Sequence, residues 1–251
     1  SHGLMQVSDR PQWRTVEGGS REYVSCLTAS YAKSVQLNCG ARKVHRLNDG
    51  RQILIEDDRG NMSRFDHVVI AAHADQAFSM LDDPSDQERA LLGAFRYTQN
   101  TAVLHTDLGL MPKRKAAWSS WNYLSPEGDD KRQSVSVTYW MNRLQGLDER
   151  TPYFVTLNAY REIEEQYIKK IISYEHPFYD RAAIKAQQQL WKLQGVRNTW
   201  YCGSYFGYGF HEDALQSGLA AAEALGGARR PWNVLDESSR IHLQPTRELA
   251  A

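Results

Sequence analysis

The feature that most constrains this chain is a strand, a glycine loop and an alanine-rich helix that follow one another over residues 200–225. The segment starts with apolar and aromatic residues, passes through a loop with Gly203, Gly207 and Gly209, and continues into small residues. Such a turn brings backbone N–H groups close to a ligand at the positive end of a helix. Small residues such as Gly218 also serve helix packing alone, so the segment fits either a ligand site or a tight helix–sheet contact.

A second glycine pair, Gly18 and Gly19, stands before another predicted helix. The pair permits a close approach of the backbone, and Ser20 is a suitable N-cap for a helix that runs to about Ala32. A glycine pair before a helix is also a common turn. This segment therefore predicts a loop and a helix, with a ligand contact as one of two interpretations.

Two further regions predict strands near the first helix. Residues 44–47 and 52–57 read as strands joined by a turn at Asn48, Asp49 and Gly50. Residues 65–74 follow as a buried strand that ends in small side chains.

The middle of the chain predicts a separate layer of antiparallel strands, because apolar and polar residues alternate there. Residues 163–174 carry apolar side chains at helical spacing, with the helix ending near Pro177. Residues 182–193 fit a strand or a helix equally well. The predicted strands are residues 101–107, 116–124, 134–141 and 154–158, with a polar turn at 126–130.

Aromatic residues are dense in this middle layer. Trp118, Trp121 and Tyr139 are candidates for lining an apolar substrate cavity, since alternate positions of a strand share a face. Aromatic side chains more often pack in the core of a sheet, so that interpretation stays open for each of them.

Charge and cysteine content disfavour several functions. Lysine plus arginine equals aspartate plus glutamate at 30 each, which gives no electrostatic case for nucleic acid or an anionic membrane. No apolar run is long enough to span a bilayer, and no signal peptide is recognised. The three cysteines are odd in number and lack metal-ligand spacing. We therefore expect a reducing compartment, the cytoplasm, and no integral membrane segment.

Metal and serine-hydrolase chemistry have no motif to rest on. The eight histidines are scattered without a His-Glu-x-x-His or paired ligand spacing, and we expect no metal site. A Gly-x-Ser-x-Gly elbow is also missing.

The segments around Gly203, Gly19 and Ala71 occur in the order found in the FAD-dependent flavin-containing amine oxidoreductase and desaturase superfamily, which this chain resembles. The resemblance includes bacterial proteins described only as NAD/FAD-binding. It implies an α/β fold of the glutathione-reductase-like FAD-binding type, with an inserted α+β substrate domain. The implied division is residues 1–95 and 196–251 for parts of the FAD-binding domain and 96–195 for the substrate domain.

One element of that family is missing from the sequence. The family carries a βαβ unit with Gly-x-Gly-x-x-Gly, whose glycines cradle the pyrophosphate, and no such fingerprint occurs here. We therefore expect an incomplete FAD-binding fold, the C-terminal portion of a longer enzyme. Exposed sheet edges in such a portion would favour association into homo-oligomers.

The resemblance also implies roles for particular residues. His211 is a candidate proton carrier and Phe210 matches an aromatic-cage tyrosine of amine oxidases, although an isolated loop histidine is more often structural. Glu212 and Asp213 either contact the cofactor or only complement the helix dipole. The residues implied to bind FAD are Gly18, Gly19, Ser20, Val44, Ala71, Ala72, Gly203, Ser204, Glu212, Asp213 and Ala214.

Departures from the amine oxidase pattern bear on the substrate. Ser204 follows Gly203 where those enzymes carry an acid, Phe210 lacks the tyrosine hydroxyl, and residues 95–106 contain no lysine. These differences favour hydride removal from an apolar or amine-type small molecule, closer to the desaturases, by an FAD-dependent oxidoreductase. The alternative is a non-catalytic binding or assembly module derived from a flavoprotein fold.

Overall fold

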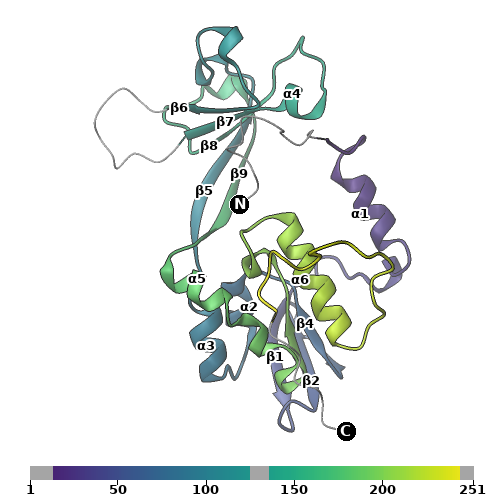
Figure 1. Ribbon diagram of the computed structural model, residues 1–251. Helices are drawn as coiled ribbons and strands as arrows, with labels where there is room; N and C mark the ends of the chain where they lie inside the picture. Colours follow the sequence, from purple (N-terminus) through teal and green to yellow (C-terminus); the bar gives the residue numbers. More distant parts are fainter. Residues whose placement is uncertain (1–13, 125–135, 244–251) are drawn as a thin grey trace. The chain divides into compact units, whose positions relative to one another are not determined.

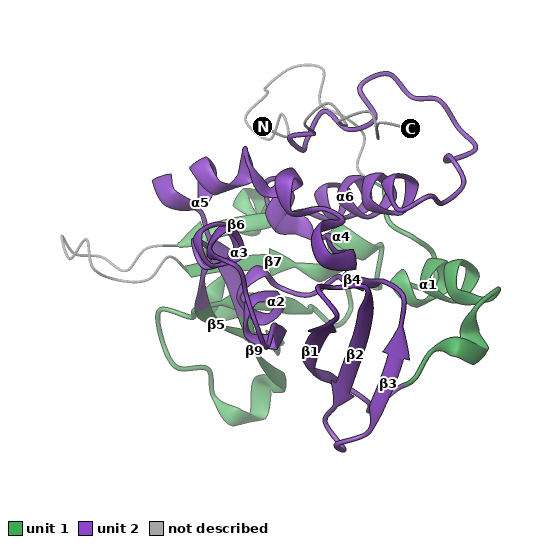
Figure 2. Cartoon of the chain, turned by 90° about the horizontal axis from the view of Figure 1, so that it is seen from below, with its two compact units in different colours: residues 1–36, 99–174 green, residues 37–98, 175–251 purple. Residues whose placement is uncertain are grey.

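The structure, a computed structural model, describes residues 14–124 and 136–243 (Figure 1). The chain forms two compact units, coloured separately in Figure 2. Unit 1 takes in residues 1–36 and 99–174, and unit 2 takes in residues 37–98 and 175–251. The division into FAD-binding and substrate domains at residues 95 and 195 stays a prediction.

Unit 1 holds most of a five-stranded sheet with the order β6-β7-β8-β5-β9; the first residues of β5 and the last residues of β9 are assigned to unit 2. The pairs β6–β7, β7–β8 and β8–β5 are antiparallel, as expected for strands of alternating polarity. One face of this sheet is buried: Phe154 is fully buried and packs with Met111 and Trp140. The strands are β5 (Arg96–His105), β6 (Trp121–Leu124), β7 (Ser136–Trp140), β8 (Phe154–Leu157) and β9 (Ile168–Phe178).

Short helices complete the described part of unit 1. The helix α1 (Ser20–Thr28) has no buried residue, so none of its side chains belongs to the core of the described chain. The remaining helical segments are η1 (Ala32–Ser34), η2 (Leu108–Leu110), η3 (Lys115–Ala117), α4 (Met141–Gln145) and η4 (Glu165–Tyr167).

Unit 2 combines an antiparallel sheet, a parallel strand pair and several helices. The antiparallel sheet has the order β1-β2-β3, and β4 (Val68–Ile70) pairs in parallel with β10 (Thr199–Tyr201). The sheet strands are β1 (Ala41–Leu47), β2 (Gln52–Asp57) and β3 (Met62–Phe65). The helices are α2 (Ala74–Met80), α3 (Asp86–Leu92), α5 (Arg181–Gln187), η5 (Leu190–Leu193), η6 (Val196–Asn198), η7 (Ser204–Phe206) and α6 (His211–Ala224).

A buried ion pair crosses the core of unit 2. Arg46 of β1 donates to Glu88 of α3 at 2.6 Å, and the Tyr201 hydroxyl of β10 donates to the same carboxylate at 2.6 Å. Burial by itself would raise the pKa of Glu88, but the hydrogen bonds from Arg46, Tyr201 and the Ser85 N–H outweigh it and lower this pKa to about 2. The network therefore joins three elements through one ionised carboxylate.

Several predicted elements are confirmed. The strand pair around the Asn48, Asp49 and Gly50 turn is β1 and β2, and each of these three residues has a positive φ. The expected mixture of sheets and helices is present. The strand–loop–helix of residues 200–225 becomes β10, a glycine loop and α6.

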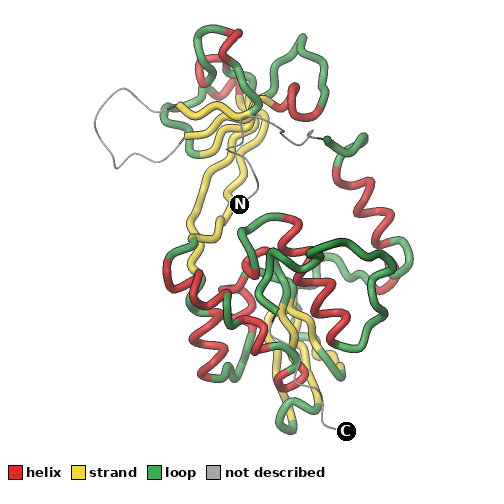
Figure 3. The backbone as a smooth tube through the Cα atoms, in the orientation of Figure 1, coloured by secondary structure: helices red, strands yellow, loops and turns green. Residues whose placement is uncertain are grey.

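The predicted helix over residues 163–174 is wrong. These residues form η4 and most of β9, which pairs with β5 at the edge of the sheet (Figure 3). β-branched isoleucines favour a strand, and a neighbouring strand decides between the two periods. Pro177 lies inside β9, where an edge strand tolerates a residue without an N–H.

Other boundaries also need correction. The first helix ends at Thr28 rather than near Ala32, and its N-cap is Gly19 rather than Ser20. Of residues 116–124 only 121–124 form a strand, and of residues 65–74 only Val68–Ile70 form β4. Residues 182–193, left open between strand and helix, are mostly helical. The predicted turn at 126–130 lies outside the described residues.

Candidate functional site

The carboxyl ends of β4 and β10 meet at one edge of unit 2. The Cys202 N–H donates to the Ile70 carbonyl at 3.2 Å, and a Cβ on Gly203 would lie 3.4 Å from the Ala72 carbonyl oxygen. The structure thus brings Ala72 beside Gly203, and the shared ligand contact of Ala71, Ala72 and Gly203 stays a prediction. In α/β proteins, ligands bind beyond the carboxyl ends of parallel strands.

Gly203 is required by packing within the chain. Its φ is 156°, and a Cβ would lie 2.7 Å from the Tyr205 ring. The Gly203 N–H donates to Ser217 Oγ at 3.0 Å, so this amide already has an acceptor. The glycine therefore allows the strand to turn against α6, whether or not a ligand binds.

The loop between Gly207 and α6 is held by the carboxylate of Asp213. This side chain is fully buried, and its Oδ2 accepts the N–H groups of Tyr208 at 2.9 Å and Phe210 at 2.8 Å. Phe210 is the N-cap of α6 and Asp213 the third helical residue, the position of the acid in a capping box. The structure thus gives Asp213 a capping role, and its predicted contact with a cofactor stays a prediction.

The first turn of α6 is accessible. Phe210 is 46% exposed, and His211 and Glu212 are also exposed. The Asp213 and Ala214 N–H groups donate to the Phe210 carbonyl, whereas the two preceding helical amides have no acceptor within a regular helix. The amides that remain for an anionic ligand are therefore those of His211 and Glu212.

A neutral tyrosine lies under the glycine loop. The Tyr179 hydroxyl donates to the Ser204 carbonyl at 3.5 Å, and it would lie 3.0 Å from a Cβ on Gly209. Burial, with the nearby Tyr97 and Asp213 adding to it, raises the pKa of Tyr179 far above its ordinary value. Tyr179 therefore supports the loop without adding charge to it.

The first glycine pair belongs to unit 1; a Cβ on Gly18 would lie 2.7 Å from the Glu22 side chain, whereas Gly19 is open. Gly18 and Gly19 have φ angles of 79° and 87°, and no atom lies within 4 Å of a Cβ placed on Gly19. Ser20, the first residue of α1, is exposed. Their role in cofactor binding stays a prediction.

Val44 lies in the core of unit 2. Its side chain is 1% exposed, and its carbonyl accepts the Asp82 N–H at 3.2 Å. Its backbone also pairs with Ile55 in the β1–β2 ladder. The predicted contact with a ligand through the Val44 backbone stays untested.

The three aromatic candidates of the middle layer do not share a face. Trp121 and Tyr139 are directly paired across β6 and β7. Trp118 instead packs against Trp140 and Phe154, at ring-centroid distances of 5.2 and 5.7 Å, on the buried face. Only Trp121 and Tyr139 are therefore placed to present a surface together.

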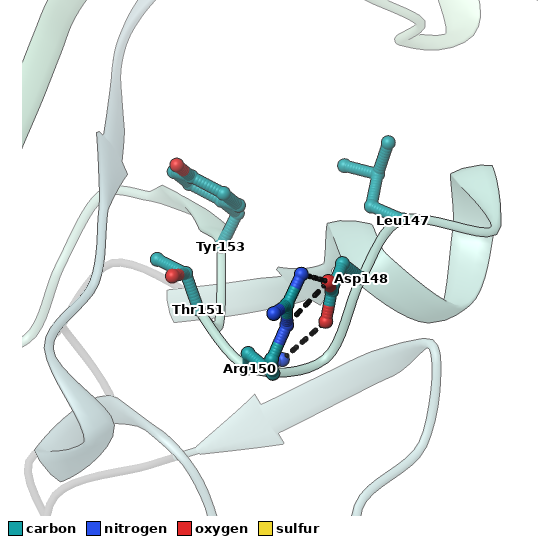
Figure 4. Close-up of a pocket in the computed structure, with 5 residues that line it drawn as sticks. All are labelled: Leu147, Asp148, Arg150, Thr151 and Tyr153. Atoms are coloured by element: carbon teal, nitrogen blue, oxygen red, sulfur yellow. Dashed lines mark hydrogen bonds and ion pairs between the residues drawn. The ribbon is translucent and has the colours of Figure 1, made fainter.

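A separate hollow of about 440 Å³ lies in the loop between α4 and β8 (Figure 4). Asp148 and Arg150 line it and pair with each other at 2.6 Å, and this hydrogen bond lowers the pKa of Asp148. The two charges satisfy one another within the loop. The hollow is lined by Leu147, Asp148, Arg150, Thr151 and Tyr153, none of which the sequence had indicated.

None of the described helices has the length and apolar character that crossing a bilayer requires. Within residues 14–124 and 136–243, no group of three or more His, Cys, Asp or Glu side chains is placed to hold a metal ion.

The sequence did not indicate Tyr179 or Arg240 at this site. Arg240 donates from Nε to Asp213 Oδ1 at 2.5 Å, 27 positions along the chain. No local pattern signals such a contact, because nothing near Arg240 in the sequence indicates where the segment after α6 returns. Ser217, in contrast, lies next to Gly218, which the sequence indicated as a small residue of the helix.

Comparison with known proteins extends this picture. A family model described as "Flavin containing amine oxidoreductase" matches residues 4–226. The comparison with curated protein sequences finds no match.

Solved structures share the fold at low sequence identity. A CLA-producing fatty acid isomerase from P. acnes superposes with a TM-score of 0.55 at 15% identity, over 83% of this chain and 51% of its own. A putrescine oxidase variant gives 0.57 at 12% identity, over 83% and 53%. A reduced UDP-galactopyranose mutase gives 0.50 at 11%, over 76% and 47%.

A strand, glycine loop and helix beside a second parallel strand define an α/β protein of the kind that binds ligands at the carboxyl ends of its strands. The chain belongs to the flavin-containing amine oxidoreductase family. It spans about half the length of the solved structures that it matches.

Proposed function

We propose that the chain is part of an FAD-dependent oxidoreductase that removes a hydride from an apolar small molecule. The observation that carries the proposal is the junction of β10, the glycine loop and α6, where an accessible helix N-terminus follows the end of a parallel strand. Family membership supports a flavin as the cofactor.

The residues at this junction fit one end of a flavin. Phe210, His211 and Glu212 are exposed, and the first amides of a 14-residue helix favour a partial negative charge. Ala71, Ala72 and Ser204 would flank the ligand at the strand ends. The amides of Gly203, Asp213 and Ala214 donate to acceptors within the chain. We therefore propose that these three residues support the site rather than bind the flavin through their amides.

The protein's own groups would orient and shield the reacting atoms. FAD, when bound, supplies the hydride acceptor. The exposed ring of Phe210 offers an apolar surface beside the first turn of α6, and His211 next to it is the proposed proton carrier. Gly18, Gly19, Ser20 and Val44 stay in the proposal as further contacts with the cofactor, on the resemblance alone.

An apolar substrate is supported by one face of the sheet in unit 1. Trp121 and Tyr139 lie on the face opposite to the buried Trp140 and Phe154, because side chains alternate along a strand. Trp121 is 41% exposed. The face carries no charged side chain among the paired positions of β5 to β8: Ala102, Leu104, Trp121, Tyr123, Val137, Tyr139, Val155 and Leu157.

The experiment that tests the cofactor is an FAD titration followed by flavin fluorescence and the visible spectrum. It compares this chain with any longer form of the protein that carries a Gly-x-Gly-x-x-Gly unit. Saturable binding by either one supports the proposal, and binding by the longer form alone assigns this chain a part of the site. Absence of binding by both contradicts the proposal.

A charge change at the first turn of α6 sharpens this test. His211→Asp adds a negative charge that stabilises the helix by about 0.3–1 kcal/mol but repels the electron-rich edge of a flavin. We expect higher stability with weaker FAD binding. His211→Asn controls for loss of the imidazole, and Ala224→Asp, at the exposed far end of α6, should lower stability without weakening binding.

A second function has a specific observation in its favour. Several of the predicted cofactor contacts already have partners inside the fold, among them the Gly203 N–H and the Val44 carbonyl. Such a site is also what a non-catalytic binding or assembly module would retain. Failure of FAD binding in both forms, with the fold intact by circular dichroism, favours this alternative.

A further inference from the structure

We propose that Arg240 is a positioning residue for the loop at residues 207–210. It fixes and neutralises the buried Asp213 carboxylate, which in turn holds the loop amides at the start of α6. The inference deepens the proposed function and rests on it, because this loop and the first turn of α6 are where the flavin is proposed to bind.

The first step is the cost of an unpaired charge at Asp213. Its side chain is 0% exposed, so the carboxylate has no direct contact with water. It accepts two backbone N–H groups at Oδ2, from Tyr208 and Phe210, and at Oδ1 it has the Arg240 guanidinium. A buried charge without a partner of opposite sign is strongly destabilising. The loop amides therefore depend on a carboxylate that itself depends on Arg240.

The second step is that residues 240 and 241 are themselves anchored. The Arg240 N–H donates to Gln216 Oε1 at 3.1 Å, and Ile241 is buried in the core of unit 2. The Arg240 guanidinium also lies over the Tyr208 ring, 5.8 Å from its centroid. The arginine is therefore held from its backbone, and its side chain contacts the loop at Tyr208 and helix α6 at Asp213.

The third step is that the loop closes tightly on this pair. A Cβ on Gly207 would lie 2.7 Å from Asp213 Cγ and 2.8 Å from the Arg240 carbonyl oxygen. Gly207 leaves room for both partners at once. The conformation of the loop is thus determined jointly by Asp213 and by the segment after α6.

The test is amide hydrogen exchange of this chain, read at Tyr208 and Phe210. Arg240→Gln should raise both exchange rates at least about tenfold, because the carboxylate loses its charged partner. Arg240→Lys should give a smaller increase, since it keeps the charge. Arg229→Gln is the matched control: Arg229 lies in the same segment and pairs with Glu223 and Glu237, but not with Asp213.

A charge-neutral double variant separates positioning from general packing. Asp213→Asn combined with Arg240→Gln removes both charges and keeps an oxygen that accepts the loop amides. Positioning by charge compensation predicts exchange rates closer to the native chain than those of Arg240→Gln alone. Rates as fast as the single variant, or faster, contradict the inference, as does an Arg240→Gln variant that matches Arg229→Gln.

FAD titration of the same variants distinguishes this inference from the proposed function. In a protein that binds FAD, Arg240→Gln should weaken binding and shift the visible flavin band, and Arg229→Gln should do neither. Faster loop exchange with unchanged FAD affinity and spectrum overturns positioning toward the flavin. Faster loop exchange in Arg240→Gln, in a protein that does not bind FAD in any form, supports the role of Arg240 in holding the loop and overturns the flavin proposal.

Discussion

The two glycine loops of this chain look alike in sequence and differ in structure. At Gly19, before α1, a side-chain Cβ would have no atom within 4 Å, and α1 has no buried residue. In the loop before α6, a Cβ on Gly203 would clash with Tyr205, and a Cβ on Gly207 would clash with Asp213. A glycine before a helix thus signals either an open approach or a crowded turn, and only the packing tells which.

The difference also separates two reasons for keeping a glycine. In the loop before α6, packing within the chain already requires Gly203 and Gly207. In the loop before α1, no described contact requires Gly19, although its φ of 87° still favours glycine. A ligand or protein found to contact the first loop would therefore explain Gly19, whereas Gly203 and Gly207 are already explained by packing within the chain.

The largest effect should come from removing the acid that holds the second loop. Asp213→Ala leaves two loop amides and Arg240 without their carboxylate, and we expect a loss of about 3–5 kcal/mol in the free energy of unfolding. Urea denaturation measures it. The exposed neighbour Glu212→Ala, and Glu22→Ala beside the first loop, should each stay within about 0.5 kcal/mol. A small loss for Asp213→Ala would show that the second loop is not held as described.

Lowering the pH should destabilise the contact between Glu88 and β10, the strand that leads into the second loop. The pKa of Glu88 is about 2 in the fold against 4.5 for the free side chain, so the unfolded chain binds more protons between these values. The contribution of Glu88 to the free energy of unfolding is complete above about pH 4.5. It is lost as the pH drops toward 2, and the loss is on the order of 3 kcal/mol. Denaturation curves over this range check it. Glu88→Gln should flatten this part of the pH profile, and an unchanged slope would assign it to other acids.

Adding a methyl group should distinguish crowded from open glycines. Gly207→Ala forces a carbon against Asp213 and the Arg240 carbonyl, and we expect a loss of about 1–3 kcal/mol. Gly218→Ala, inside α6 with no atom within 4 Å of the new carbon, should gain roughly 0.5–1 kcal/mol from helix propensity. Thermal or urea unfolding compares the two. Equal effects would mean that crowding does not decide the cost.

The smallest effect should come from the first loop. Gly19→Ala disfavours the observed φ, but α1 has no buried side chain whose displacement would affect the core. We expect a change in the global unfolding free energy within about 0.5 kcal/mol, with local fraying of α1 seen by hydrogen exchange. A loss comparable to that of Gly207→Ala would show that this loop is also packed in solution, and would remove the contrast between the two loops.

The local sequence predicted those elements whose conformation depends mainly on their own residues. The hairpin at Asn48, Asp49 and Gly50 and the junction before α6 were found this way. The helix expected over 163–174 failed because pairing of β9 with β5 outweighed an apolar spacing that fits both periods. Trp118 was placed with Trp121, but a 3-10 turn before β6 directs it to the buried face.

The sequence by itself determined the turns, the strand–glycine–helix order and the balanced charge, because each depends on neighbouring residues or on composition. Only the tertiary structure decided which backbone amides remain for a ligand. That choice depends on Ser217 reaching Gly203, on Asp213 capping its own helix and on Arg240 returning to Asp213. Two of these contacts join positions 14 and 27 residues apart. No local pattern specifies such contacts, since they form only when the core brings the segments together.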